Sequence, residues 1–225
     1  MLDAALPDDP DPGSELYRAR LLAMLARFDE AWQLARAASA RWHELAGRPT
    51  SYVLAEVAWL SGEREAAVSY LRAHCEMCEK HRQRALLSSF APMLGRWLCA
   101  LHRYSEAEYF ARLGSELGDP QDVFTQMLWR QALALVLASR GEHAPADRLV
   151  GEAVALSEQT DALDAQGDAL CDVAYVLQSA GRGEEAPAVL EQALERYERK
   201  QNIPQATMVR NRLAGLGTRY HSTVT

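Results

Sequence analysis

A repeat of alanine-marked helix hairpins constrains this chain more than any other feature of its sequence. Five times an apolar stretch ends in a short polar or glycine-containing break, and an alanine follows soon after the break. The five alanines are spaced by 36, 40, 39 and 40 residues, and they are Ala31, Ala67, Ala107, Ala146 and Ala186. Repeats of this length are typical of solenoids built from stacked helix pairs.

Small residues recur at two further positions in the same register. Twelve residues before the alanines stand Ala19, Ala55, Gly95, Ala134 and Ala174. Seven residues after them stand Ala38, His74, Gly114, Ala153 and Ala193, of which only the histidine is not small. Small side chains at these places would let neighbouring helices pack at close range. The register of the second repeat stays open by one residue, because Ala66 as its marker would gain Ala73 but lose Ala55 to Leu54.

The pattern predicts five helix pairs followed by one unpaired helix. The first helices of the pairs are expected at residues 15–25, 51–61, 84–101, 122–139 and 164–180. The second helices are expected at residues 29–46, 64–82, 105–117, 144–159 and 184–200. A final helix over residues 203–216 would cap the last apolar face.

Local signals refine three of these helices. Ser105 and Glu108 have the spacing of a capping box at the start of a second helix. Gly181 follows a helix end, where a left-handed residue is favoured. Pro92 removes a backbone donor from a stretch that otherwise predicts one helix, so we expect a kink there or a helix that begins only near Ser89.

Composition agrees with a helical domain and excludes several classes of protein. The 38 alanines favour helix, and the low share of β-branched residues disfavours a sheet. A formal charge of −7 argues against sequence-independent nucleic-acid binding. No apolar run approaches the roughly 20 residues of a membrane span, and no signal-peptide pattern opens the chain. The four cysteines form no secreted pattern, so a cytoplasmic location is expected.

We expect an acidic, proline-rich disordered leader over residues 1–14, a repeat domain over residues 15–216 and a flexible tail over residues 217–225.

The small residue in each first helix and the alanine early in each second helix resemble the tetratricopeptide repeat (TPR). The resemblance covers about residues 15–216, although the period of 36 to 40 exceeds the roughly 34 residues of the family. It implies an all-α fold, a right-handed α-solenoid of about five antiparallel helix pairs with a C-terminal capping helix. The arginine- and alanine-rich turns look most like the helical arrays of bacterial, actinobacterial-type regulators linked to ATPases or cyclases.

One cluster suggests a metal site as an alternative function. On a helix His74, Cys78 and His81 share one face, and Cys75 lies within reach of them. Thiolate and imidazole form a zinc-type ligand set, but structural zinc sites usually need a second ligand pair, which is missing. We therefore interpret the cluster as buried thiols beside two histidines and predict no metal.

The remaining sequence offers no catalytic motif. Cys99 and Cys171 lie in apolar contexts with no positioned histidine, which is typical of buried structural thiols. Gly181-Arg182-Gly183 lacks the lysine and the preceding strand of a phosphate-binding loop. We expect neither an enzyme nor a cofactor.

The resemblance places the first helices on the concave surface of the array, which predicts a groove for a protein or peptide partner. Asp164, Asp168 and Asp172 follow one helix face, which is either part of this groove or an ordinary solvated surface. The lysine-and-asparagine clamp of chaperone-tail receptors is absent from the groove. Partner binding to nucleic acid or membrane is not expected, and self-association is left open. The predicted groove residues are Tyr17, Arg20, Tyr52, Glu56, Trp59, Arg96, Gln131, Asp168, Asp172, Tyr175 and Gln178.

Overall fold

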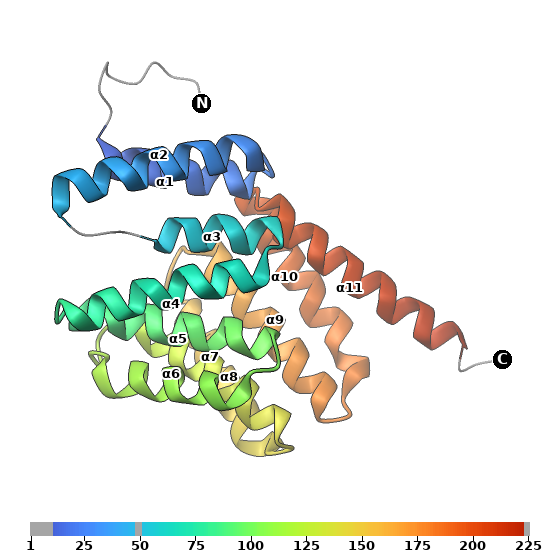
Figure 1. Cartoon of the computed structure of the whole chain (residues 1–225). Helices are drawn as coiled ribbons and strands as arrows, with labels where there is room; N and C mark the ends of the chain where they lie inside the picture. The colour runs from blue at the N-terminus through green and yellow to red at the C-terminus, as the bar shows by residue number, and fades with distance from the viewer. Residues whose placement is uncertain (1–10, 48–50, 223–225) are drawn as a thin grey trace. The chain divides into compact units, whose positions relative to one another are not determined.

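The computed structural model describes residues 11–47 and 51–222, with side chains described as far as residue 216, and its regular elements there are all helices. The chain divides into two compact units, Met1–Arg82 and Gln83–Thr225, which are described separately below. In each unit, consecutive helices lie side by side as hairpins (Figure 1).

The first unit contains two hairpins. They are formed by α1 (Pro12–Met24) with α2 (Phe28–Ala46) and by α3 (Tyr52–Ser61) with α4 (Arg64–Lys80). α3 also packs on both α1 and α2. Leucines and valines of the first helices meet alanines of α2 in one core, with Trp32 and Trp42 packed at its edge.

The second unit contains three hairpins and a final helix. They are α5 (Arg84–Ala100) with α6 (Tyr104–Leu117), α7 (Val123–Ser139) with α8 (His143–Ser157), and α9 (Leu163–Ser179) with α10 (Ala186–Lys200). The first helices are neighbours, since α7 packs on both α5 and α9. A short 3₁₀ helix, η1 (Gly183–Glu185), precedes α10, and α11 (Ile203–Ser222) packs on α10. The predicted arrangement of five helix pairs and a final helix is therefore confirmed.

All five hairpins use the same backbone turn. The residue five positions before each marker alanine has a positive φ of 58 to 90°, and these residues are Ala26, Gly62, His102, Gly141 and Gly181. The next residue donates its N–H to the carbonyl five residues earlier, as in Arg103 to Leu98 at 3.0 Å. This is the Schellman arrangement, which ends a helix with one left-handed residue. Gly181 was predicted to take that role, and the prediction is confirmed.

Every small-residue position of the sequence pattern is buried. Each of the fifteen positions lies inside a helix contact, and Gly95 shows how close the backbones come. A Cβ atom added at Gly95 would lie 2.9 Å from the carbonyl oxygen of Ala107. Ala67 is buried and Ala66 only partly, so the open register of the second repeat resolves to Ala67. His74 is the one large residue at such a position, and it is buried too.

Two local predictions need correction. The capping box is wrong, because α6 begins at Tyr104 and its N-cap is Arg103, whose guanidinium pairs with Glu106 at 2.7 Å. α5 runs unbroken from Arg84 through Pro92, so a start near Ser89 is also wrong. A Cβ at Gly114 would lie 2.6 Å from the Pro92 ring, which explains why the facing position of α6 is a glycine.

The predicted ends of the domain also shift. α1 begins at Pro12, where a missing N–H costs little, and Asp11 accepts a hydrogen bond from the Ser14 N–H at 3.1 Å. The predicted leader covers residues 1–14. Its residues 12–14 are helical, whereas residues 1–10 lie outside the described residues. α11 continues to Ser222, beyond the predicted end at residue 216.

Candidate functional site

In residues 1–82 the structure joins two of the predicted groove residues. Arg20 on α1 donates through Nε to Glu56 Oε1 on α3 at 2.9 Å. Tyr17 is 57 % exposed. Tyr52 packs instead against the His74 ring, with centroids 5.4 Å apart. The predicted set is thus only partly assembled in this unit.

Trp59 is covered by a neighbour on the same hairpin. The guanidinium carbon of Arg64 lies 3.8 Å from the centroid of the Trp59 ring, and Arg64 also donates to the Trp59 carbonyl at 2.9 Å. A cation stacked on an aromatic face is a stabilising contact within the hairpin. One face of this indole is therefore occupied by the chain itself.

In residues 83–225 the structure joins predicted residues from three successive first helices. Arg96 on α5 donates to both carboxylate oxygens of Asp172 on α9, at 2.7 and 3.0 Å. Gln131 on α7 lies between them and donates to Asp172 Oδ2 at 3.1 Å. A second carboxylate, that of Asp168, lies 3.3 Å from Arg96. Four predicted residues therefore form one polar network.

A residue on α10, the second helix of the last hairpin, completes this network. Tyr197 on α10 donates its hydroxyl to Asp168 Oδ1 at 2.6 Å. The tyrosine ring fits against Gly167, where an added Cβ would lie 2.8 Å from the ring. Tyr197 is not among the residues predicted from the sequence, and the glycine in the interior of α9 is the signal that could have pointed to a bulky neighbour there.

The electrostatics favour a charged arginine held between two carboxyl groups. Burial alone would lower the pKa of Arg96, but Asp168 and Asp172 hold that pKa well above its usual value. Burial raises the pKa of the Asp172 carboxyl, and the Arg96 guanidinium opposes that shift. Burial, together with the Asp168 carboxylate, raises the pKa of Tyr197, so its hydroxyl remains a hydrogen-bond donor.

Burial decides which members of the network can meet a partner. Asp172 is 5 % exposed and Gln131 is 0 % exposed, so neither side chain is accessible to a partner. The sequence pattern predicts both in an open groove, whereas the structure buries them. Asp168 keeps 30 % of its side chain accessible and is the member that reaches the surface most.

Two tyrosines, one on α9 and one on α6, form a further polar contact between hairpins. Tyr175 on α9 shares a hydrogen bond of 3.0 Å with Tyr104 at the start of α6, and Tyr104 in turn contacts His102 Nδ1 at 2.9 Å. Burial raises the pKa of Tyr175, so this hydroxyl stays protonated. Tyr104 is not among the groove residues predicted from the sequence.

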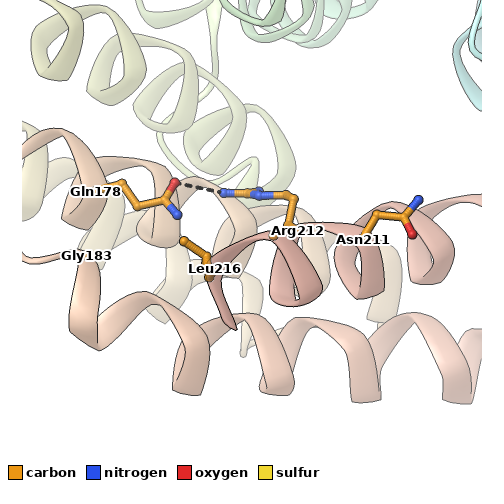
Figure 2. A pocket seen from close by; sticks show the side chains of 6 residues that line it. Gln178, Gly183, Asn211, Arg212 and Leu216 are labelled. Carbon is orange, nitrogen blue, oxygen red and sulfur yellow. Dashed lines mark hydrogen bonds between the residues drawn. The ribbon is translucent and has the colours of Figure 1, made fainter. Parts of the chain in front are cut away.

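A pocket of about 480 Å³ lies beside the end of α9. It is lined by Gln178, Gly183, Asn211, Arg212, Gly215 and Leu216. Figure 2 shows Arg212 extending from α11 towards Gln178, with Asn211 on its other side. The Arg212 Nη2 atom lies 3.5 Å from the Gln178 side-chain oxygen. Gln178 is one of the groove residues predicted from the sequence, whereas the final helix is predicted only to cap the array.

Each unit has a first-helix face of its own. In the first unit it is the surface of α1 and α3 that carries Tyr17, Arg20 and Glu56, and in the second unit it is the surface of α9 that carries Asp168, Tyr175 and Gln178. The second of these surfaces leads to the pocket through Gln178, which lines it.

The cysteine and histidine cluster does not favour a metal site. In the part of the chain that the structure describes, no group of three or more histidine, cysteine or acidic side chains is arranged to hold a metal ion. His74, Cys75 and Cys78 are buried, whereas His81 is exposed. Burial lowers the pKa of His74 to about 4 and raises that of Cys75 to about 12.

The other two cysteines are also buried thiols. Burial raises the pKa of Cys99 and of Cys171 to about 12. A nucleophilic cysteine needs the opposite shift, because the thiolate is the reactive form.

Comparison with known proteins agrees with this architecture. Residues 167–200 match the tetratricopeptide repeat family, and this stretch holds Ala174, Ala186 and Ala193, the three small residues of the fifth repeat. No curated protein matches the sequence.

Two solved structures of nearly identical TPR-like repeats from Podosopora anserina, described as putative kinesin light chain, share the fold. One is 19 % identical with a TM-score of 0.52, covering 84 % of this chain and 96 % of that chain. The other, a variant of the same repeats, is 19 % identical with a TM-score of 0.54, covering 86 % of this chain and 99 % of that chain. The fold is that of a TPR-like helical repeat protein, a class that generally provides scaffolds for protein interaction.

The described helices include none with the length and apolar character that crossing a membrane would require.

Proposed function

We propose that this chain is a non-enzymatic scaffold that binds a protein or peptide through the first-helix face of at least one of its two units. The observation that carries the proposal is that, within each unit, polar side chains of successive first helices meet on a TPR-like fold, and that Tyr175 on α9 also meets Tyr104 on α6. Stacked helix pairs present extended surfaces of this kind to partners. Aromatic and arginine side chains are also the residues that dominate binding energy at interfaces.

The proposal includes the absence of catalysis and of a metal. It is supported by the three thiols whose pKa is raised to about 12, which disfavours cysteine nucleophiles at neutral pH. The acidic balance of the chain supports a protein partner over nucleic acid.

We also propose a cytoplasmic location and a role as the sensory or interaction segment of a bacterial regulator. The location is supported by four buried cysteine thiols. The regulator context rests on the resemblance of the turns to the arrays of such proteins. Co-purification of an ATPase, cyclase or transcription factor with the chain would support this context, and its recovery with other classes of protein alone would contradict it.

The scaffold is tested by capture of partners with the whole chain and with surface variants. Tyr17→Asp and Gln178→Lys change the first-helix face. Tyr109→Asp and Gln192→Lys are the matched controls on second helices, because Tyr109 is 59 % exposed on α6 and Gln192 is exposed on α10. Partners are identified by mass spectrometry, and their affinity for each variant is then measured with purified components.

We expect at least one of the two face variants to lose its partner while both controls retain it. Equal retention by all four variants would contradict binding at this face. Loss of the partner by the control variants alone would indicate that the partner binds the second helices instead.

A further inference from the structure

Arg212 differs from the other arginines around it. Among the described residues, no carboxylate lies within 4.0 Å of its guanidinium, and its one hydrogen bond is the 3.5 Å contact with Gln178. Arg210, two residues earlier on α11, pairs instead with Glu198 at 2.6 Å. Arg182, in the turn after α9, pairs with Glu185 at 2.7 Å. A guanidinium has five N–H donors, so most of those of Arg212 remain available.

The surroundings of Arg212 fit an anionic group. The positive charge of Arg212 favours the ionised form of Asp172, but the Asp172 carboxylate is already bound by Arg96. Two amide side chains, Gln178 and Asn211, flank the pocket and can donate further hydrogen bonds. Leu216 adds an apolar wall (Figure 2). A planar guanidinium binds a carboxylate in a bidentate manner that an amide alone cannot match.

We propose that this pocket binds an acidic side chain of the partner peptide, with Arg212 as the residue that pairs with its carboxylate. The inference rests on the proposed function and specifies the chemistry of the partner where it passes the end of α9 in the second unit.

Two features favour a side chain within a peptide over a small free anion. A volume of about 480 Å³ exceeds what one carboxylate fills, which leaves room for the groups that adjoin an acidic side chain in a peptide. Tyr175 and Gln178 are three residues apart on α9 and therefore neighbours on one helix face. A peptide that follows α9 would pass Tyr175 before it reaches the pocket, and Leu216 would contact an aliphatic residue next to the acidic one.

The test is a titration of the full chain, labelled with ¹⁵N-arginine, followed by NMR. The probes are acetylated and amidated pentapeptides with leucines around a central glutamate or a central glutamine. A third probe has the central glutamine and a free C-terminal carboxylate, and inorganic phosphate is the fourth. The Arg212 Nε–H signal is assigned from its loss in the Arg212→Gln variant.

The expected result is a saturable shift of the Arg212 signal with the glutamate peptide and an affinity at least about tenfold weaker for the glutamine peptide. Arg212→Gln should weaken binding of the glutamate peptide by a similar factor. Arg210→Gln is the matched control on the same helix and should leave the affinity unchanged. Thermal melting of both variants shows whether either substitution affects folding.

Equal binding of the glutamate and glutamine peptides would overturn the proposal. Stronger binding of the free C-terminal carboxylate or of phosphate would overturn the assignment to a side chain. If the first-helix variants lose a captured partner but Arg212→Gln retains it in full, the scaffold stands and only this inference fails. If neither set of variants affects the captured partner, both fail.

Discussion

Arg96 on α5 and Asp172 on α9 form a bidentate ion pair, at 2.7 and 3.0 Å, between two hairpins that are not consecutive in the chain. Gln131 on the intervening α7 donates to the same carboxylate. A buried pair of this kind adds little net stability compared with apolar packing, but removal of one partner is costly because the other charge is left buried. The pair therefore fixes which side chains of the three first helices face one another.

Enlarging a small residue at a helix contact should destabilise the chain. Ala134 and Ala174 are 0 % exposed, and a leucine at either position must displace a neighbouring helix. We expect Ala134→Leu and Ala174→Leu each to lower the free energy of unfolding by about 1–3 kcal/mol in urea denaturation. Ala155→Leu on α8 and Ala188→Leu on α10 are exposed controls and should change it by less than about 0.5 kcal/mol. Equal effects at buried and exposed positions would contradict the register.

The left-handed turn residues give a second prediction. Gly181 has a φ of 75°, and an added Cβ would meet no atom within 4 Å, so Gly181→Ala tests backbone strain alone. We expect a loss of about 1–2 kcal/mol in the free energy of unfolding. Gly183→Ala, two residues later and with equally open space for a Cβ, lacks a positive φ and should be neutral or slightly stabilising. Ala26→Gly, at the same turn position of the first hairpin, should raise stability. Similar losses for both glycine variants would argue against the shared turn.

His74 should make the first unit sensitive to acid. Burial lowers its pKa to about 4 in the folded chain, against 6.5 when exposed, so the unfolded state binds the proton more readily. The contribution of His74 to the free energy of unfolding is therefore fully present above about pH 6.5. It is lost as the pH falls towards 4, because the unfolded state gains a proton that the folded state does not yet bind.

Replacement of His74 tests this directly. Four repeats have alanine or glycine at this position, so His74→Ala should fold. We expect the melting temperature of the variant to fall less between about pH 7 and pH 4.5 than that of the unaltered chain. His81→Ala, at an exposed histidine of the same hairpin, should keep the full pH dependence. If the melting temperature of His74→Ala depends on pH as strongly as that of the unaltered chain, buried His74 is not the cause of the acid sensitivity.

Periodicity was sufficient to predict the hairpins but not their caps. The alanine register located both helices of every hairpin to within a few residues, because close helix packing requires small side chains at fixed places. The cap of α6 was missed because the Ser105 and Glu108 spacing matched a familiar motif by chance. The structure instead uses an arginine that pairs with a glutamate three residues later, in Arg27 with Glu30, Arg103 with Glu106 and Arg182 with Glu185.

The candidate site was predicted only as a list of helix faces. A helical pattern can assign Asp172 to a face, but it cannot show that Arg96 reaches across α7 to bind it. The burial of Asp172 and Gln131 follows from that long-range contact. Arg212 was missed for a related reason, since its significance depends on Gln178 and the pocket beside it, which only the packing of the final helix creates.

A double-mutant cycle between Arg96 and Asp172 tests most directly whether the first helices of the second unit are joined by a buried polar network. The free energy of unfolding is measured for the chain, for Arg96→Ala, for Asp172→Ala and for the double variant. We predict that each single substitution costs about 3–5 kcal/mol and that the coupling energy is about 2 kcal/mol or more. Additive effects, with a coupling energy below about 0.5 kcal/mol, would contradict the network.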